Sequence, residues 1–203
     1  MKRSYSQYFE DLELDKAFKN KTLGFYVDVG ANDPRILSNT YHFYLKGWRG
    51  INIEPDTDLF TKLEKYRKED INLNIGIARR RGKRKFFNIS APTLSTFSEI
   101  TAIRSESEGY KINEIKYIDV IPLSQILDKY LVNGKVDFFS IDVEGYESEV
   151  LRSNNWRKYR PEFIIIEINR SGKEIKSFLE SKMYRQIFEN GTNAIFRDNN
   201  LKN

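Results

Sequence analysis

Strand-length apolar segments alternate with helix-length segments along most of the chain, and this alternation constrains the fold more than any other feature. Such a pattern favours a mostly parallel sheet with helices on both faces. The run "FIIIEI" (163–168) is typical of a strand buried on both sides, and "ENGTN" (189–193) predicts the turn of an antiparallel edge hairpin. The predicted strands are Phe25–Val29, Gly50–Ile53, Ile71–Ile77, Lys85–Ile89, Tyr117–Ile121, Asp137–Val143, Phe163–Ile168, Tyr184–Phe188 and Ala194–Phe196. The predicted helices are Ile36–Lys46, Asp56–Lys68, Ser124–Val132, Glu147–Ser153 and Ser171–Ser181.

The 203 residues can bury one hydrophobic core, and no linker or repeat divides them, so we predict a single domain over residues 1–203. The chain has no cysteine, which excludes disulfides and thiolate zinc sites. It lacks the pattern of a signal peptide and any apolar run of about 18 residues. We therefore expect a cytoplasmic protein without a transmembrane segment.

The formal net charge of +5 comes largely from one basic run at residues 79–85. Gly82 interrupts this run between the apolar segments "INLNIGIA" (71–78) and "FFNIS" (86–90), a layout typical of a solvated β-hairpin turn. The alternative is a patch that attracts an anionic substrate, a lipid surface or a polynucleotide.

Four of the predicted parallel strands end in a carboxylate or are followed directly by one. These carboxylates are Asp28, Glu54, Asp142 with Glu144, and Glu167. Helix capping explains an acid at one or two such positions, and four exceed that need. Because ligands of open α/β sheets bind outside the carboxyl ends of the strands, these residues predict a ligand site at this edge.

The turn after the first strand, in "FYVDVGANDP" (25–34), indicates the kind of cofactor. A dinucleotide needs a glycine-rich turn because its pyrophosphate presses against a helix N-terminus. Here Asn32, Asp33 and Pro34 bring bulk and negative charge instead, which favours a cationic ligand without phosphate. Glu54, one strand–helix–strand step later, can accept both hydroxyls of a ribose. S-adenosylmethionine has a ribose, an amino group and a sulfonium, and it meets these requirements.

Seven segments of the sequence together form a more specific pattern. They are "SYSQYFEDLEL" (4–14), "FYVDVGANDP" (25–34), "SNTYHFYLKGWRGINIEPD" (38–56), "LST" (94–96), "IPLSQILD" (121–128), "SIDVEGYESEVL" (140–151) and "PEFIIIE" (161–167). In this combination the chain resembles the FkbM-type S-adenosylmethionine-dependent methyltransferases over about residues 4–168. The resemblance implies a Rossmann-like class I methyltransferase fold with a mostly parallel seven-stranded sheet. It also implies O-methylation of a sugar, a glycan or another hydroxyl compound.

The resemblance carries roles onto the residues that match the family's motifs. Asp28, Gly30, Ala31 and Asn32 match the first cofactor loop, Glu54 and Pro55 the ribose turn, Ile77 and Ala78 the adenine segment, and Asp142 the motif after the fourth strand. Residues 1–20, with Gln7, Glu10 and Asp11, match an N-terminal element that is expected to fold over the site. Many relatives have Gly where this chain has Pro34, which implies a stiffer loop.

Methyl transfer from a sulfonium requires the acceptor oxygen in line with the S–CH₃ bond, and an alcohol must also lose its proton. We predict Glu144, after the fourth parallel strand, as the general base, with Asp142 beside it. His42, the only histidine, is a second candidate base because of its pKa, although a histidine among aromatics in a helix more commonly packs. Further candidate substrate contacts are Ser95, Thr96 and Tyr146.

The motif "IDVEGYES" (141–148) loosely resembles the segment with which metal-dependent sugar O-methyltransferases bind a divalent cation. By that resemblance Asp142 and Glu167 would be ligands of Mg²⁺ or a similar ion, with Asn169 as a third. The alternative is structural: Glu167 pairs with Arg170 or caps the helix that follows.

The leading prediction is therefore an O-methyltransferase that acts on a sugar or glycan, with a non-sugar small molecule as an alternative acceptor. A nucleic-acid methyltransferase is supported only by the basic run, and the amine motif of base N-methylases does not follow the fourth strand. A nonenzymatic binding module is the third hypothesis, and the retained strand-end acids argue against it.

Overall fold

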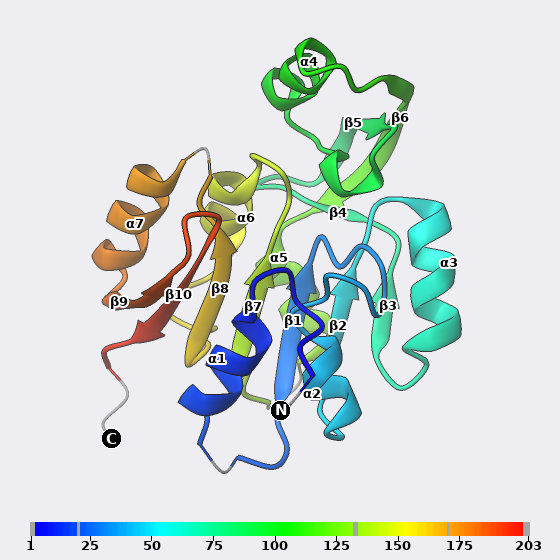
Figure 1. Ribbon diagram of the computed structural model, residues 1–203. Helices are drawn as coiled ribbons and strands as arrows, with labels where there is room; N and C mark the ends of the chain where they lie inside the picture. Colours follow the sequence, from blue (N-terminus) through cyan, green and yellow to red (C-terminus); the bar gives the residue numbers. More distant parts are fainter. Residues whose placement is uncertain (1–2, 20, 132–133, 170, 201–203) are drawn as a thin grey trace.

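A seven-stranded sheet forms the centre of the molecule in a computed structural model that describes residues 3–19, 21–131, 134–169 and 171–200 (Figure 1). The strand order is β3-β2-β1-β7-β8-β10-β9; β10 is antiparallel to both neighbours and the other pairs are parallel. This arrangement confirms the predicted fold class, including the antiparallel hairpin at the edge. The strands are β1 (Phe25–Val29), β2 (Arg49–Ile53), β3 (Ile71–Leu73), β7 (Phe138–Ile141), β8 (Phe163–Glu167), β9 (Tyr184–Glu189) and β10 (Asn193–Asp198).

Helices cover both faces of this sheet (Figure 1). Side chains of α1 and α2 pack on one face, those of α5, α6 and α7 pack on the other, and α3 lies beside β3. Amphipathic spacing explains this packing, since α5 buries Leu123, Ile126 and Leu127 against the sheet. The helices are α1 (Glu10–Ala17), α2 (Tyr41–Leu45), α3 (Thr57–Tyr66), α4 (Glu99–Ser107), α5 (Leu123–Tyr130), α6 (Glu147–Ser153) and α7 (Gly172–Ser181), with a short 3₁₀ turn, η1 (Pro92–Leu94).

A second, three-stranded sheet has the order β4-β6-β5 and projects beyond the main sheet together with α4 (Figure 1). The prediction that residues 71–77 form one strand, from which residues 85–89 fold back as a hairpin, is wrong. Residues 71–73 pair in the main sheet, and the strand ends because the Asn74 side-chain amide donates to two carbonyls of the ribose turn (2.8 and 3.0 Å). The strands of the second sheet are β4 (Gly76–Ile77), β5 (Gly82–Ile89) and β6 (Ile112–Ile121).

The basic run 79–85 is therefore not the turn of a hairpin, which is a further correction. It leads from β4 into β5, and β6 lies between these two strands because it pairs parallel with β4 and antiparallel with β5. The predicted strand at residues 117–121 is the second half of β6 and belongs to this small sheet.

Two further segments differ from the sequence-based expectation. The predicted helix at residues 36–46 is confined to α2, because Asp33 accepts hydrogen bonds from two backbone amides of the next turn (3.0 Å each) and Leu37 has a φ of 55°. Residues 90–116, which show no sustained period, contain η1, α4 and the start of β6.

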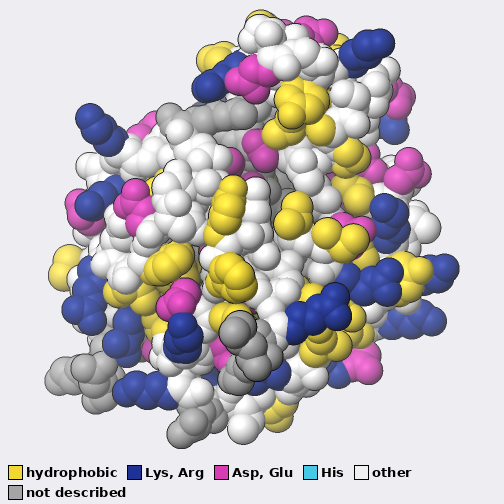
Figure 2. Space-filling view, in the orientation of Figure 1, with side chains coloured by type: hydrophobic (Ala, Val, Ile, Leu, Met, Phe, Trp, Pro, Cys, Tyr) yellow, Lys and Arg dark blue, Asp and Glu magenta, His cyan; other side chains and the backbone are white. Residues whose placement is uncertain are grey.

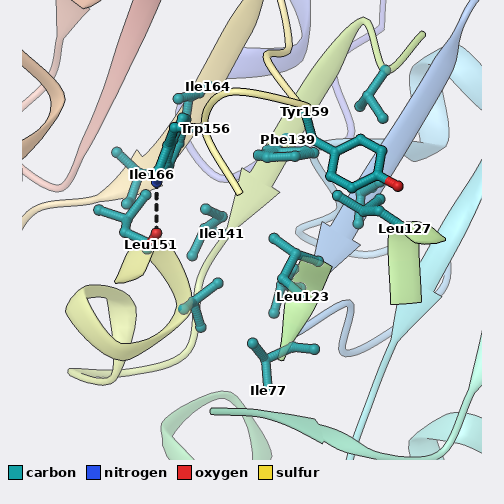
Figure 3. Packing of buried hydrophobic residues seen from close by; sticks show 14 of the residues in the cluster. Ile77, Leu123, Leu127, Phe139, Ile141, Leu151, Trp156, Tyr159, Ile164 and Ile166 are labelled. Atoms are coloured by element: carbon teal, nitrogen blue, oxygen red, sulfur yellow. Dashed lines mark hydrogen bonds between the residues drawn. The ribbon is translucent and has the colours of Figure 1, made fainter. Parts of the chain in front are cut away.

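Two hydrophobic clusters fix the helices on the sheet. One is aromatic, with the rings of Phe43 and Phe138 centred 4.8 Å apart and that of Trp48 within 6.0 Å of both. The other, shown in Figure 3, joins aliphatic strand residues such as Ile164 to Leu123 and the rest of α5. Within the described part of the chain, no helix has the length and apolar character needed to cross a membrane.

Candidate active site

Two adjoining cavities lie at the edge where β1, β2, β7 and β8 end, as the strand-end acids predict. Gly30, Asn32, Asp142 and Glu144 line both cavities, so the two share a wall. The first cavity has mainly apolar walls, whereas the second, with a volume of about 240 Å³, is lined chiefly by polar side chains. The first is lined by residues that include Glu54, Pro55, Ile77, Phe86, Phe97 and Tyr146.

The loop after β1 approaches the loop after β7 so closely that Gly30 admits no side chain. Its φ is 80°, and a Cβ atom added there would lie 1.9 Å from the carbonyl oxygen of Asp142. The amides of Gly30 and Ala31 donate to the carbonyl of Ile53 at the end of β2 (2.9 and 3.2 Å). The ends of three neighbouring strands are thus tied together around the shared wall of the cavities.

Glu54 joins the loops that form the first cavity. One carboxylate oxygen accepts from the amide of Asn32 and the other from the amide of Asp56, both at 2.8 Å. Burial raises the pKa of Glu54 to about 7, against the effect of these two hydrogen bonds. A carboxyl group with this pKa in an apolar cavity favours a ligand that donates hydrogen bonds to it.

The apolar wall of the first cavity comes largely from the small sheet. Phe97 packs against Phe86 of β5 and against Tyr146 in tilted geometry, with ring centroids 4.9 and 5.7 Å apart. The sequence contains no local signal for Phe86 or Phe97. Phe86 reaches the site on β5, which pairs with β6, and Phe97 follows Thr96, which forms a bridge to Phe87 of β5. Ile77 lines the cavity as predicted, whereas the buried Ala78 lies behind it and donates its amide to Ile121 (3.2 Å).

The turn after β7 has an unusual backbone conformation that aims Glu144 into both cavities. Glu144 has a φ of 53°, a region that residues other than glycine adopt rarely and chiefly at functional sites. The Thr96 hydroxyl donates to the Glu144 carbonyl (2.8 Å), and Glu147 accepts from the amide of Gly145 (3.0 Å). The predicted contact Thr96 therefore fixes this turn, and it lines the first cavity together with Ser95.

Three carboxylates meet where β7 and β8 end. Oxygens of Asp142, Glu144 and Glu167 lie within 4.8 Å of one another. Burial raises the pKa of Asp142 well above its ordinary value, and the charges of Glu167 and Glu144 raise it further. Such a cluster can accept a proton from a substrate or hold a cation.

The predicted metal ligands fit this cluster only in part. Asp142 and Glu167 belong to it, and the third carboxylate within reach is Glu144. Asn169 instead donates its side-chain amide to Glu167 (2.7 Å). Arg170, the predicted structural partner of Glu167, lies outside the described residues.

The second cavity is closed on one side by the N-terminal element. Gln7 lines it, the carbonyl of Tyr5 accepts from the amide of Ser38 (2.9 Å), and Glu10 accepts from the amide groups of Asn190 and Asn193 (2.9 and 2.7 Å). These contacts fasten residues 5–10 to the loop after β1 and to β10. The polar lining comprises Gln7, Asp28, Asn32, Ser38, Asn39, Thr93, Ser140, Asp142, Glu144, Glu167, Asn169, Thr192 and Asn193.

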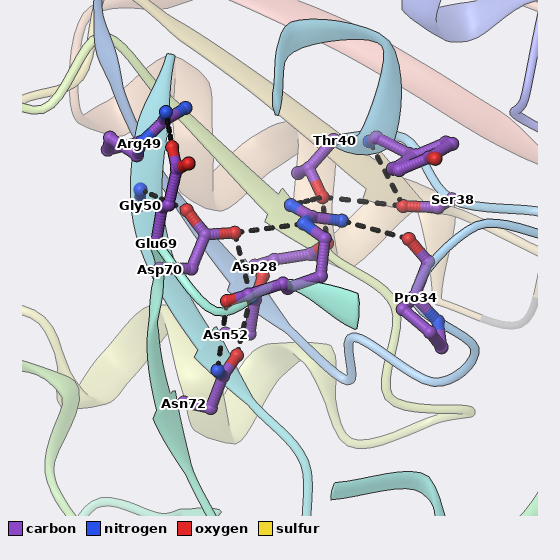
Figure 4. A network of polar contacts seen from close by, with 12 residues as sticks. Asp28, Pro34, Ser38, Thr40, Arg49, Gly50, Asn52, Glu69, Asp70 and Asn72 are labelled. Carbon is purple, nitrogen blue, oxygen red and sulfur yellow. Dashed lines mark hydrogen bonds and ion pairs between the residues drawn. The ribbon is translucent and has the colours of Figure 1, made fainter. Parts of the chain in front are cut away.

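A network of polar contacts lies beside Asp28 and includes Thr40 and Asp70 (Figure 4). At its centre is the buried Arg67. The Arg67 guanidinium donates to Asp70 (2.9 Å), to the carbonyl of Pro34 (3.1 Å) and to the hydroxyl of Thr40 (3.0 Å). That hydroxyl in turn donates to the carboxylate of Asp28 (2.7 Å). Burial raises the pKa of Asp28, while the contacts with Thr40 and Arg67 oppose the rise. The loop with Pro34 is thereby pinned to the core.

His42 lies apart from both cavities. Its Nε2 is 3.2 Å from a carboxylate oxygen of Asp15, on the face of the sheet covered by α1 and α2. His42 does not occur among the described residues that line either cavity. Its predicted role as a base stays a prediction, which its position does not favour.

Comparisons with known proteins agree with this geometry. A family model described as "Methyltransferase FkbM domain" matches residues 28–187, more than half of the chain. The structure of a human methyltransferase 10 domain containing protein is similar over 97% of this chain and 84% of that one, at 11% identity and a TM-score of 0.51. At this identity the likeness shows the fold alone.

Two other solved structures are less similar. The METTL16 MTase domain matches 93% of this chain, which covers 65% of that chain, at 12% identity and a TM-score of 0.49. A Burkholderia thailandensis 1,6-didemethyltoxoflavin-N1-methyltransferase with bound S-adenosylhomocysteine matches 94% of this chain and 75% of its own, at 9% identity and a TM-score of 0.46. A comparison with curated proteins gave no match.

Proposed function

The chain belongs to the FkbM methyltransferase family, and from this premise we propose that it transfers the methyl group of S-adenosylmethionine to a hydroxyl group of a sugar or glycan. The proposal rests on two adjoining cavities. The first is apolar and contains Glu54, which can bind a ribose, and the second is lined by carboxylates, amides and hydroxyls.

The first cavity suits the adenosine part of the cofactor. The apolar walls, with Ile77 and Phe97, match the faces of an adenine ring, and Glu54 can accept hydrogen bonds from ribose hydroxyls. The methionine part would extend along the shared wall at Gly30 toward Asp28 and Asp142. Those carboxylates attract its ammonium and sulfonium charges.

The second cavity suits a polyol. Its amide and hydroxyl side chains offer both donors and acceptors at short range, as a sugar with several hydroxyls requires. Its carboxylates Asp28, Asp142, Glu144 and Glu167 repel phosphate, which disfavours a nucleic-acid backbone inside the cavity. A sugar hydroxyl therefore fits better than a nucleotide at the point of methylation.

S-adenosylmethionine supplies an electrophilic methyl group on a positively charged sulfur. In the proposed reaction the acceptor oxygen forms a bond to this methyl group, the S–CH₃ bond breaks, and the acceptor proton passes to the carboxylate of Glu144. Asp142, whose pKa is raised by burial and by its acidic neighbours, can hold a proton within the cluster. The walls of the cavities align the two reactants.

A divalent cation is an alternative way to activate the hydroxyl. Asp142, Glu144 and Glu167 offer the oxygen ligands that Mg²⁺ prefers, and a bound cation would lower the pKa of the acceptor hydroxyl. Chelation distinguishes the two routes, because proton transfer to Glu144 alone is insensitive to EDTA.

The test is the release of S-adenosylhomocysteine over a panel of neutral sugars, with and without EDTA. Glu144→Gln should lower kcat about 10²- to 10⁴-fold while cofactor binding, measured by calorimetry, stays unchanged. Glu54→Gln should weaken cofactor binding first. Glu180→Gln, on the exposed end of α7, is the matched control. Full activity of the Glu144 variant would refute the base, and absence of cofactor binding by the wild type would refute the function.

A further inference from the structure

The second cavity, called the acceptor cavity from here on, is bordered by the loop after β1. This loop also forms one wall of a separate cleft. Asn32 and Leu37 line the acceptor cavity, whereas residues 33–35 between them line the cleft. The cleft has a volume of about 290 Å³. It is lined chiefly by Asp33, Pro34 and Arg35 of the loop and by Lys62, Lys65 and Tyr66 of α3.

Positive charges converge in this cleft on one aromatic ring. The Arg35 guanidinium lies 4.2 Å and the Lys65 ammonium 5.2 Å from the centre of the Tyr66 ring. Neither cation forms an ion pair with any residue that the structure describes. Lys62 makes only a loose contact with Asp33 (3.8 Å). Figure 2 shows Lys and Arg side chains gathered on the side of the molecule where α3 lies.

Both walls of the cleft are fixed by the core. The carbonyl of Pro34 accepts from the buried Arg67 (3.1 Å), and Asp33 closes its own turn through two backbone amides. On the other wall, α3 is anchored by the buried side chains of Leu59 and Leu63. The cations thus project from a rigid frame, which lowers the entropic cost of binding an anion.

We propose that this cleft binds a phosphate group carried by the acceptor, outside the cavity in which the methylated hydroxyl lies. The inference rests on the proposed function, because it takes the acceptor to be a sugar. Four carboxylates exclude a phosphate from the acceptor cavity, so a phosphorylated sugar must place that group elsewhere. Arg35, in the loop that borders the acceptor cavity, offers the bidentate hydrogen-bond donors that phosphate prefers.

The first arm of the test measures binding alone and needs no turnover. Inorganic phosphate is titrated into the ¹⁵N-labelled protein, and amide shifts are followed by NMR. Saturable shifts are expected at the amides of Asp33 and Arg35 and in α3. The double variant Arg35→Gln/Lys65→Gln should abolish them. Lys83→Gln/Lys85→Gln, which removes the same charge from the exposed part of β5, should leave them unchanged.

The second arm compares one sugar with its phosphate ester as acceptor. The wild type should show a KM for the ester about 3- to 10-fold lower than for the free sugar, the size expected from two exposed charge pairs. Arg35→Gln/Lys65→Gln should equalise the two KM values with kcat unchanged. The Lys83/Lys85 control should keep the preference.

The outcomes separate the cleft from the methyltransferase activity. Saturable phosphate binding without turnover of any sugar would refute the proposed function and support a site for free phosphate. Equal losses in both double variants would overturn the cleft, because general charge would explain them. A single-stranded oligonucleotide that competes with phosphate and is itself methylated would also overturn the sugar-phosphate proposal, in favour of a nucleic-acid acceptor.

Discussion

Two groups of charged side chains lie beside the sheet, one near the starts of β2 and β3 and the other where β7 and β8 end, and they are built in opposite ways. Around Arg67, opposite charges meet: its guanidinium donates to Asp70, and Tyr26 bridges the two with hydrogen bonds of 2.6 and 2.7 Å. Around Asp142, like charges meet, with Glu144 and Glu167 within 4.8 Å. The first group completes its own hydrogen bonds, whereas the second gathers negative charge in front of a cavity.

The pKa directions express the same contrast. Burial lowers the pKa of Arg67, but the charge of Asp70 and the hydrogen bond to Tyr26 raise it above its ordinary value, so the cation is retained inside the protein. The group around Asp142, called the carboxylate cluster, also includes Glu147, which the charge of Glu167 affects. Burial and neighbouring acids raise the pKa of both Asp142 and Glu147. One group therefore stabilises the fold, and the other stores unfavourable charge that a cationic cofactor can relieve.

The largest effect is expected from Arg67→Met. The substitution leaves Asp70 charged and buried and the carbonyl of Pro34 without its donor, so the free energy of unfolding should fall by about 3–5 kcal/mol. Urea denaturation measures this change. Lys68→Met, at the exposed neighbouring position, should stay within about 0.5 kcal/mol of the wild type. A loss below about 1 kcal/mol for Arg67→Met would show that the network does not stabilise the fold.

The carboxylate cluster should respond in the opposite direction to Glu147→Gln. Burial, reinforced by the charge of Glu167, raises the pKa of Glu147 to about 7 from an ordinary 4.5. A single oxygen of Glu147 accepts from both the Val143 and Gly145 amides, and a glutamine can keep both bonds. At pH 8 the variant should be more stable by about 3 kcal/mol, since each pKa unit of this shift corresponds to about 1.4 kcal/mol.

The sign of this effect fixes its pH window. The folded protein binds the Glu147 proton more tightly than the unfolded chain, so wild-type stability falls as pH rises from about 4.5 through about 7. The gain from Glu147→Gln should therefore be complete above pH 7 and disappear near pH 4.5. Thermal melts at several pH values measure it. A gain that does not change with pH would contradict the assignment of the shift to this carboxyl group.

The two groups also differ in how far the sequence predicts them. Strand-end acids such as Asp28 and Glu167 follow from local patterns, because a strand that ends in a carboxylate can be recognised without knowing its neighbours. Arg67 lies in the predicted charged helix at residues 56–68, where periodicity gives no reason to bury it. Its burial depends on the end of α3 at Tyr66 and on the hydrogen bond that its guanidinium donates to Asp70.

The wall of the first cavity could not be predicted for a related reason. Phe86 reaches the site on β5, whose partners on β6 lie about thirty residues away. Phe97 reaches it through the bridge between Thr96 and Phe87 of β5. The sequence predicted instead a local hairpin around the basic run, since nearby partners are the default choice. Main-sheet pairing stops at Leu73, where the side chain of Asn74 bonds the carbonyls of Glu54 and Pro55, and the next strand belongs to the second sheet.

A smaller effect is expected from Tyr26→Phe, which tests whether charge or hydrogen bonding holds the Arg67 group together. The variant keeps the arginine and Asp70 in contact and removes only the hydroxyl between them. The free energy of unfolding should fall by about 1–2 kcal/mol, as for one buried hydrogen-bonding group. Tyr130→Phe, at the end of α5, is the control. A loss as large as that of Arg67→Met would assign the stability of the group to its hydrogen bonds.

The smallest effect is expected from His42→Gln, at a third charge group that lies between the two extremes. Asp15 there contacts both His42 (3.2 Å) and Lys46, whose side chain is 31% exposed, so Asp15 keeps a partly solvated ion pair when the imidazole is removed. Removing the imidazole should change stability by less than about 1 kcal/mol and leave kcat unchanged, because His42 lies outside the two cavities. The methyl-transfer assay checks the second point. A kcat lower by two orders of magnitude would identify His42 as the base. The proposed catalytic role of Glu144 in the carboxylate cluster would then be wrong.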